Sequence, residues 1–199
     1  MIELEFATNN KHKIEEIRNI IDNEKYGLKN KVKILSLSDI GCFEDIPETS
    51  DTFTGNASQK ARYVFDNYGY NCFADDSGLE IDALEGRPGV RSARYAGENS
   101  TQESLISKVL SELQGIENRK ANFKTVVSLI IDGKENFFEG IVNGSIRKTP
   151  IGTNGFGYDP IFEADGYNIT FAEMELMEKN KISHRARAVK KLIEYLGGL

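Results

Sequence analysis

The feature that most constrains the fold is a strand pattern followed at once by a helix pattern. Over residues 2–6, apolar side chains alternate with glutamates, which is the period of a half-buried strand. Asn10 can then cap a helix whose apolar positions recur at helical spacing, at Ile14, Ile17, Ile20 and Ile21. An opening strand–helix unit favours an α/β fold, in which helices cover a sheet.

The rest of the chain continues with strand–helix units and then a hairpin. The patterns predict a strand at Val32–Leu37, a helix at Phe53–Asn67 ending before Gly69, and a short apolar strand at Cys72–Ala74 with alternation resuming at Leu79. An arginine-bearing loop at Gly86–Gly97 and a helix after a capping box at Ser100 and Glu103 follow. The last predicted elements are a hairpin of Ala121–Ile131 and Phe137–Ile141 around Asp132-Gly133 and a helix at Ser183–Leu196. We therefore predict an α/β fold with a mixed sheet. No repeat or linker interrupts the pattern, so we expect one domain over residues 1–199.

Composition excludes several classes of protein. The 199 residues carry 25 Lys and Arg against 31 Asp and Glu, a net charge of −6 that argues against a general nucleic-acid surface. Two histidines and two cysteines are too few for a Cys/His zinc cluster. No apolar run reaches the ~20 residues that span a bilayer, and we see no secretory signal. We expect a cytoplasmic protein without a membrane or nucleic-acid partner.

The turn between the first strand and the first helix suits an anion. Thr8, Asn10 and Lys13 lie where unpaired backbone N–H groups gather at a helix start, and Lys13 adds a full positive charge. Taken alone, the fragment also fits an ordinary cap followed by a solvated lysine. It is not a Walker A loop, because Gly133-Lys134 is followed by Glu135.

Paired carboxylates follow the apolar segment that ends at Ala74. We place Asp75 and Asp76 at the end of a strand, where one could ligate magnesium and the other could act as a base or support it. Because neighbouring strand residues point to opposite faces, at most one carboxylate enters a given site. An Asp-rich turn is the alternative. Glu48 could add a carboxylate, and alone it also fits a solvated loop residue.

Two later segments carry further candidates. The loop 152–160 combines glycines, which let backbone approach a ligand, with Phe156 and Tyr158, on which a base can stack. A hairpin loop with aromatic side chains plugging the core is the alternative. At residues 183–185, donors and a cation lie at a helix start, which also fits a cap followed by a basic first turn.

Read together, these segments resemble the inosine triphosphate pyrophosphatase family, and closely its bacterial dITP/XTP pyrophosphatase branch. The motifs that carry the resemblance follow one another through almost the whole chain: Phe6 to Lys13, Glu48-Thr49, Asn56-Ala57, Lys60-Ala61, Ala74 to Leu79, Pro88 to Tyr95, Gly155 to Pro160, and Ser183 to Arg185. One such motif is weak, whereas this many in one order are highly specific.

The resemblance implies an elongated, curved mixed sheet with flanking helices, two lobes around a central cleft, and a homodimer. It also implies Mg²⁺-dependent hydrolysis of non-canonical purine nucleoside triphosphates (ITP, dITP and XTP) to the nucleoside monophosphate and pyrophosphate, with one or more Mg²⁺ per subunit. The implied biological role is to cleanse the nucleotide pool and so prevent incorporation of these nucleotides into DNA and RNA.

Residue roles follow from the same resemblance. Asp76 would be the proton acceptor and a metal ligand, Glu48 a second metal ligand, and Asp75 a supporting carboxylate. The substrate-contacting residues would be Thr8, Asn9, Asn10, Lys11, His12, Lys13, Ser77, Phe156, Gly157, Tyr158, Asp159, Lys179, His184 and Arg185. Among them Thr8, Asn10 and Lys13 would hold the triphosphate. Phe156 would stack on the purine, with Gly157, Tyr158 and Asp159 completing that wall. His184 and Arg185 would read the base.

Two other functions stay open. One is a related nucleotide pyrophosphatase with a different base preference, such as modified pyrimidines. The other is a catalytically silent nucleotide-binding module, against which the paired carboxylates argue, because a pure binder of anionic phosphates gains nothing from unpaired negative charge. The ranking among ITP, dITP and XTP does not follow from the sequence.

Overall fold

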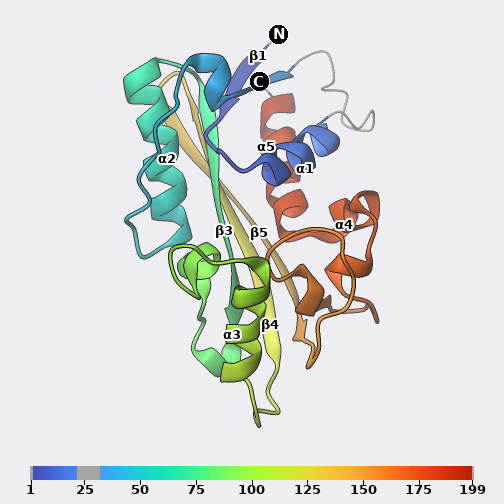
Figure 1. The fold of residues 1–199 in the computed structure, drawn as a ribbon. Helices are drawn as coiled ribbons and strands as arrows, with labels where there is room; N and C mark the ends of the chain where they lie inside the picture. Colours follow the sequence, from blue (N-terminus) through green and yellow to red (C-terminus); the bar gives the residue numbers. More distant parts are fainter. Residues whose placement is uncertain (1, 22–31, 199) are drawn as a thin grey trace. The chain divides into compact units, whose positions relative to one another are not determined.

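The computed structural model describes residues 2–21 and 32–198, and its contacts fall into two units (Figure 1). Unit 1 comprises Met1–Asp76, Thr125–Gly140 and Ala186–Leu199. Unit 2 comprises Ser77–Lys124 and Ile141–Arg185. Each unit holds its own buried apolar residues.

Strands and helices alternate through the first half of the chain. The strands are β1 (Ile2–Phe6), β2 (Val32–Ser36), β3 (Cys72–Ile81), β4 (Lys120–Ile131), β5 (Lys134–Ile146) and β6 (Phe162–Ala164). The α-helices are α1 (Lys11–Ile21), α2 (Phe53–Tyr68), α3 (Gln102–Glu112), α4 (Leu176–Ile182) and α5 (His184–Gly197). Short 3-10 helices are η2 (Leu37–Ile40), η3 (Asp82–Leu84), η4 (Gly89–Arg94), η5 (Asp159–Ile161) and η6 (Phe171–Glu173). The predicted α/β class is confirmed.

The described strands form a mixed sheet in the order β2-β1-β3-β4-β5-β6. Strand β1 runs parallel to both neighbours, with Leu4 opposite Ile34 of β2 and Phe6 opposite Phe73 of β3. The turn 132–133, with φ values of 49° and 77°, joins β4 to β5, and β6 is antiparallel to β5. The sheet is mixed, as strand–helix units followed by a hairpin predict.

Unit 1 packs helices on both faces of its strands. Leu4 and Phe6 of β1 pack with Phe73 of β3 against apolar residues of α1 and α5, and the rings of Phe6 and Phe73 stack with centroids 4.5 Å apart. Cys72 and Ala74 of β3 instead pack with apolar residues of α2. In Figure 1, α2 lies on one side of β3 and α1 and α5 lie on the other. In the part of β3 that belongs to unit 1, Phe73 thus faces α1 and α5, whereas Cys72 and Ala74 face α2.

Unit 2 is built around a cluster of aromatic and aliphatic residues. Its buried apolar residues come from the second half of β3, from α3, and from β4, β5 and the chain that follows. The ring of Phe123 on β4 meets that of Phe162 edge to face, with centroids 4.7 Å apart, and is stacked parallel to that of Phe171 at 6.1 Å.

The predicted strand end at Asp75 and Asp76 is wrong, because β3 runs unbroken from Cys72 to Ile81. Both side chains are buried and engaged in polar contacts, so the strand can contain them without leaving unpaired charge. The element that ends here is the neighbour β1, whose last residue, Phe6, lies opposite Phe73. Just beyond that pair, Asp75 of β3 contacts Lys13 of α1.

Other local predictions need smaller corrections. The capping box of α3 lies one residue later than predicted: the Thr101 hydroxyl accepts from the Ser104 N–H at 3.2 Å, and the Ser104 hydroxyl accepts from the Thr101 N–H at 2.9 Å. Ser100 lies outside the cap, and its hydroxyl donates to the Gly97 carbonyl. The loop at 86–97 contains η4, and α4 and β6 were not predicted. Predicted α1, α2 with Gly69 after it, and the hairpin strands are confirmed, β5 being longer than expected.

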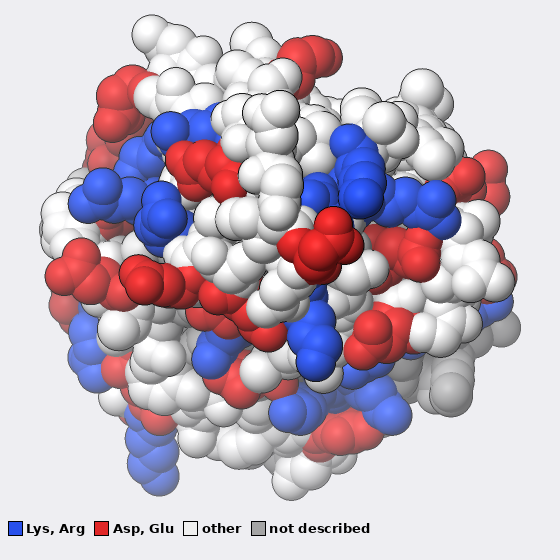
Figure 2. All heavy atoms as spheres, turned by 90° about the horizontal axis from the view of Figure 1, so that it is seen from below, with Lys and Arg blue, Asp and Glu red and all other residues white. Residues whose placement is uncertain are grey.

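On the face that Figure 2 shows, the basic side chains of the described residues are interspersed with acidic ones instead of gathering in one basic area. Within residues 2–21 and 32–198, none of the helices combines the length and apolar character that crossing a bilayer requires.

Candidate functional site

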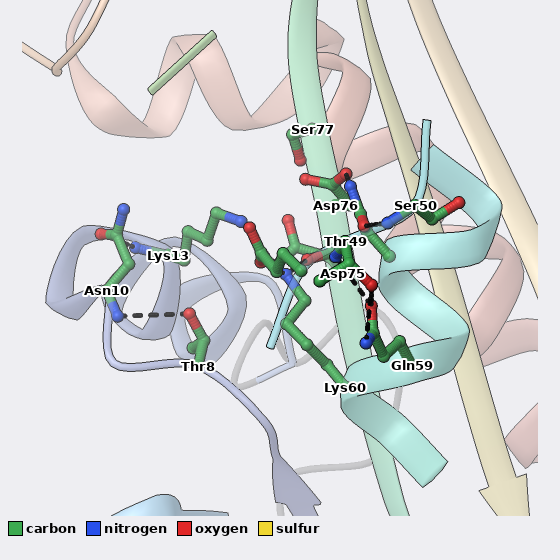
Figure 3. Close-up of polar contacts among 12 residues, drawn as sticks. Thr8, Asn10, Lys13, Thr49, Ser50, Gln59, Lys60, Asp75, Asp76 and Ser77 are labelled. Carbon is green, nitrogen blue, oxygen red and sulfur yellow. Dashed lines mark hydrogen bonds and ion pairs between the residues drawn. The ribbon is translucent and has the colours of Figure 1, made fainter. Parts of the chain in front are cut away.

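The turn between β1 and α1 is held by its own side chains. The Asn10 N–H donates to the Thr8 hydroxyl at 3.2 Å, and the side-chain oxygen of Asn10 accepts from the Lys13 N–H at 3.3 Å (Figure 3). The predicted Asn10 cap is therefore confirmed. Thr8 and Asn10 are half-buried, whereas the neighbouring side chains of Asn9, Lys11 and His12 are exposed. The arrangement leaves the first turn of α1 accessible to an anion.

Lys13 extends from α1 to the first of the paired carboxylates. Its ammonium nitrogen lies 2.9 Å from Oδ1 of Asp75, whose side chain is fully buried. The alternative of a solvated lysine is thus excluded. Asp75 is an odd-numbered residue of β3, so its side chain faces α1, as the alternation of the strand requires. A buried carboxylate without such a partner would be strongly unfavourable.

Lys60 of α2 forms the second cationic contact of this cluster and was missed by sequence reasoning. Only 6% of Lys60 is exposed, and its ammonium donates to the Asp75 backbone carbonyl at 2.7 Å and forms an ion pair with Glu48. The signal was present in the sequence as Lys60-Ala61 within a helix. Helical periodicity assigns Lys60 to the buried face, and a buried lysine requires an anionic partner.

Asp76 points to the opposite face of β3 from Asp75. Its Oδ2 accepts from the side-chain amide of Asn56 on α2 at 3.0 Å, and it is 6% exposed. The two carboxylates therefore have different partners, Lys13 for Asp75 and Asn56 for Asp76. This agrees with the prediction that at most one of them enters a given site.

Burial controls the proton affinity of Asp76. Desolvation raises the pKa of its carboxyl above the ordinary value, and the nearby Glu48 carboxylate raises it further. The positive charge of Lys60 is the largest influence that lowers this pKa, followed by the hydrogen bond from Asn56. A carboxylate whose pKa is raised by burial has the property required of a general base.

The carboxylates of unit 1 suit a hard cation that takes only one or two ligands from the protein and fills its other coordination positions with water and phosphate oxygens. Within the two described ranges, no three or more His, Cys, Asp or Glu side chains form a metal-holding group. Magnesium, however, is commonly held by one or two carboxylates together with water and substrate phosphates. Asp76 and the half-buried Glu48 supply oxygen ligands of that kind, and Glu48 lies near enough to affect the pKa of Asp76. The residues therefore fit magnesium.

Unit 2 gathers a second set of predicted residues around a buried ion pair. The Lys179 ammonium lies 2.8 Å from Oδ2 of Asp159, and each side chain is 4% exposed. The same carboxylate oxygen accepts from the Phe156 N–H at 2.9 Å. Lys179 also lies over the Phe156 ring, 5.0 Å from its centroid. Asp159 thereby links the loop that contains Phe156 with helix α4, which contains Lys179.

Two buried side chains, those of His184 and Arg185, lie at the start of α5 and belong to unit 2. Arg185 is 2% exposed, and its guanidinium carbon lies 5.7 Å from the centroid of the Phe156 ring. One Arg185 nitrogen is 3.3 Å from the Ser77 hydroxyl. His184 stacks on Phe123 with ring centroids 4.7 Å apart. These contacts bring Ser77, Phe156 and Arg185 together, which their positions in the sequence do not reveal.

Tyr158 is placed differently from its neighbour Phe156. It is 3% exposed, and its hydroxyl donates to the backbone carbonyl of Ser92 at 2.8 Å. The Ser92 hydroxyl in turn accepts from the Leu79 N–H of β3 at 2.9 Å. Tyr158 therefore packs in the core of unit 2 and ties the loop 152–160 to η4, whereas Phe156 and Gly157 are only half-buried.

Two glycines of this loop allow a matched test of the buried ion pair. Both have a positive φ, 73° at Gly155 and 62° at Gly157. A Cβ on Gly155 would lie 2.1 Å from Oδ2 of Asp159, whereas a Cβ on Gly157 would meet nothing within 4 Å. The first position thus requires glycine for space as well as for backbone conformation.

We expect Gly155→Ala to destabilise the chain more than Gly157→Ala. The backbone cost common to both is about 1–2 kcal/mol, and displacing the Asp159 carboxylate adds about 1–3 kcal/mol for the polar groups left unpaired. Urea unfolding of both variants and the parent chain measures the difference. Equal losses of unfolding free energy would show that Asp159 does not need the space beside Gly155.

The geometry defines a class of protein: an α/β fold in which a cationic helix start lies beside paired carboxylates. Comparisons with known proteins show the family to which the chain belongs. The model of the Ham1 family matches residues 4–195. The dITP/XTP pyrophosphatase of Flavobacterium johnsoniae is 53% identical over 195 residues, covering 98% of each chain. That of Bacillus subtilis is 47% identical over 199 residues, also covering 98% of each chain. The chain belongs to the Ham1 family.

Solved structures agree with this assignment. A HAM1 protein from Coxiella burnetii superposes with a TM-score of 0.90 at 37% identity, covering 100% of both chains. The Staphylococcus aureus Ham1 protein superposes with a TM-score of 0.87 at 37% identity, covering 98% of both chains. The recognition of the family from ordered sequence motifs is confirmed.

Proposed function

We propose that this chain hydrolyses the non-canonical purine nucleoside triphosphates ITP, dITP and XTP to the nucleoside monophosphate and pyrophosphate. Its full-length relatives make it an enzyme of the pyrophosphatase class. The observation that carries the proposal is the cluster in unit 1, where Lys13 pairs with the Asp75 carboxylate and Lys60 donates to the Asp75 backbone, next to Asp76. Such a cluster combines cations for phosphate with a carboxylate of raised pKa for proton transfer.

The start of α1 would hold the triphosphate. Backbone N–H groups of its first turn and the hydroxyl of Thr8 can donate to phosphate oxygens. Asn10 fixes the turn through its cap, and Lys13 supplies positive charge next to it. Asn9, Lys11 and His12, which are exposed, complete the proposed binding turn. These groups would stabilise the pyrophosphate as it leaves, mainly by position and charge.

Asp76 would act as the base. Its carboxylate would orient a water molecule and accept a proton as the water oxygen attacks the α-phosphorus. The bond from that phosphorus to the oxygen of the β-phosphate breaks, and pyrophosphate departs. Asp75, fully buried and paired with Lys13, would support the cluster without reaching the water.

Asp76 and Glu48 would hold one or more Mg²⁺ ions. When bound, Mg²⁺ would neutralise the charge of the phosphate oxygens. Lys60 pairs with Glu48 and also donates to the backbone of β3, so it keeps the Glu48 loop against the strand that carries Asp76.

The aromatic and cationic residues of unit 2 would bind the base. Phe156 offers a half-buried ring for stacking, with Gly157, Tyr158 and Asp159 forming its loop. Lys179, Ser77, His184 and Arg185 would complete the substrate contacts. Arg185 carries only donors, which suit the O6 acceptor of a 6-oxo purine and oppose the amino group of adenine.

A substrate panel tests the proposal. Pyrophosphate release is measured with ITP, XTP, dITP, dUTP and ATP in the presence of Mg²⁺. We expect the 6-oxo purines to exceed ATP in kcat/KM by about 10- to 100-fold, because each unpaired buried donor costs about 1–3 kcal/mol. A preference for dUTP would favour a pyrimidine-directed pyrophosphatase. Tight binding without Mg²⁺-dependent turnover would favour a silent nucleotide-binding module.

Further proposals rest on the resemblance. They are a homodimer, a cytoplasmic location, a role in cleansing the nucleotide pool, and a single domain over residues 1–199. In support of the last, β3, β4, β5 and α5 each contribute residues to both units, so separating the units would cut four elements.

A further inference from the structure

Asn56, in the first turns of α2, is a buried amide with two polar contacts. It is 1% exposed, its Oδ1 accepts from the Ser50 N–H at 2.8 Å, and its Nδ2 donates to Oδ2 of Asp76 at 3.0 Å. Buried amides are rarely left without partners, because each unpaired group costs its full desolvation free energy. Both ends of this amide are therefore satisfied.

These contacts determine which way the amide faces. The Ser50 backbone N–H can only donate and an ionised Asp76 can only accept, so Oδ1 of Asn56 must face Ser50 and its NH₂ group must face Asp76. A flipped amide would place donor against donor and acceptor against acceptor. One side chain thus links the segment that carries Glu48 to the carboxylate of Asp76.

The segment 48–52 lies close against the start of α2. The Thr52 hydroxyl accepts from the Gly55 N–H at 3.0 Å and caps the helix. A Cβ on Gly55 would lie 2.0 Å from the Ser50 hydroxyl oxygen, so only glycine lets Ser50 lie there. Ser50 is thereby brought to where the Asn56 amide can hold it.

Gln59 provides a natural comparison within the same helix. Its Oε1 accepts from the Thr49 N–H at 2.9 Å, and its Nε2 donates to the Thr49 hydroxyl at 3.2 Å. Gln59 and Asn56 therefore both hold the segment 48–52 to α2, and of these two amides Asn56 makes the contact with Asp76. Comparing variants of Gln59 and Asn56 therefore distinguishes loss of the contact between the segment 48–52 and α2 from loss of the contact with the Asp76 carboxylate.

We propose that Asn56 is a positioning residue for the hydrolysis: its amide holds Oδ2 of Asp76 and fixes that carboxylate relative to the segment carrying Glu48. The inference rests on the proposed function and assigns a role to a residue outside its proposed contacts with substrate and metal.

The experiment compares Asn56→Leu and Asn56→Asp with Gln59→Leu. Asn56→Leu loses both polar contacts without adding charge. Asn56→Asp keeps an acceptor for Ser50 but replaces the donor to Asp76 with a second carboxylate, which repels that of Asp76. We expect each Asn56 variant to lower kcat for ITP about 10- to 100-fold with KM changed less than about 3-fold, since misplacing a reacting group by 1 Å can cost about 100-fold. Gln59→Leu should keep kcat within about 2-fold.

A second measurement does not depend on turnover. Urea unfolding in EDTA of Asn56→Leu, Asp76→Ala and the double variant should give non-additive losses, because each single substitution removes the same hydrogen bond. ITP binding by calorimetry in EDTA should be unchanged in both Asn56 variants, since α1 is untouched. Should Asn56→Leu fail to fold, the smaller Asn56→Ala, which also adds no charge, carries the comparison.

The outcomes distinguish the inference from the proposed function. No hydrolysis of any purine nucleotide by the parent chain overturns the proposed function, and the positioning role falls with it. An active parent chain with Asn56 variants that match Gln59→Leu in kcat, or that change KM alone, overturns the positioning role and leaves the proposed function standing.

Discussion

Asp76→Asn is expected to lower kcat for ITP hydrolysis by about 10²- to 10⁴-fold, the range that a positioned general base contributes. The substitution keeps the shape of the side chain, and its amide oxygen can still accept from Asn56. It removes the negative charge and the ability to take a proton. Burial disfavours the ionised form of Asp76, so losing that charge is not expected to unfold the chain. Pyrophosphate release and urea unfolding measure the two effects.

The adjacent carboxylate is the matched control for stability. Asp75 is fully buried and pairs with Lys13, so Asp75→Asn breaks a buried ion pair and is expected to cost about 3–5 kcal/mol of unfolding free energy. Asp76→Asn should cost far less. ITP hydrolysis by Asp76→Asn at more than a tenth of the parent rate would contradict the assignment of Asp76 as the base.

Local sequence pattern predicted the elements whose signals are local. The Asn10 cap, the helical spacing of α1 and the turn 132–133 all depend on neighbouring residues, and the structure confirms them. The break placed at Asp75 and Asp76 failed because charged residues usually end a strand. Here the contacts with Lys13 and Asn56, far away in the chain, make their burial possible.

The sequence predicted which residues form the candidate site, but not which of them contact one another. Ordered motifs brought Asp76, Lys179 and Arg185 into one hypothesis, because family resemblance carries information that spacing lacks. The roles of Asn56 and Lys60 were not predicted. Each acts through one contact with β3 that exists only after α2 has packed on the strand. Periodicity can show that such a residue is buried, but it cannot identify its partner.

Glu5 is a second place where alternation predicts the backbone but not the chemistry. The pattern of residues 2–6 suggests a strand with a polar face in solvent, yet Glu5 is fully buried, between Leu35 of β2 and Cys72 of β3 in register. Neither carboxyl oxygen has a hydrogen-bond partner among the described residues. Burial raises the pKa of Glu5 from 4.5 to about 8.

This raised pKa makes stability depend on pH with a definite sign. Below pH 4.5 the carboxyl is protonated whether the chain is folded or unfolded, and its contribution to stability is fully present. Between pH 4.5 and about 8 the unfolded chain releases the proton while the folded chain retains it, so stability falls as pH rises. The largest slope is ~1.4 kcal/mol for each pH unit.

We therefore expect Glu5→Gln and Glu5→Met to gain stability over the parent chain as pH rises, by a few kcal/mol at pH 8, the order that this slope sets. Glu5→Gln keeps the size of the side chain and removes only the titration. Glu5→Met also removes the buried polar atoms, so it should be the more stable variant at every pH, by about 1–3 kcal/mol. Urea unfolding at pH 5, 7 and 9 gives the three curves. A difference between parent and Glu5→Gln that stays constant across this range would mean that Glu5 is ionised in the folded chain, and that a partner for its charge reaches it inside the sheet.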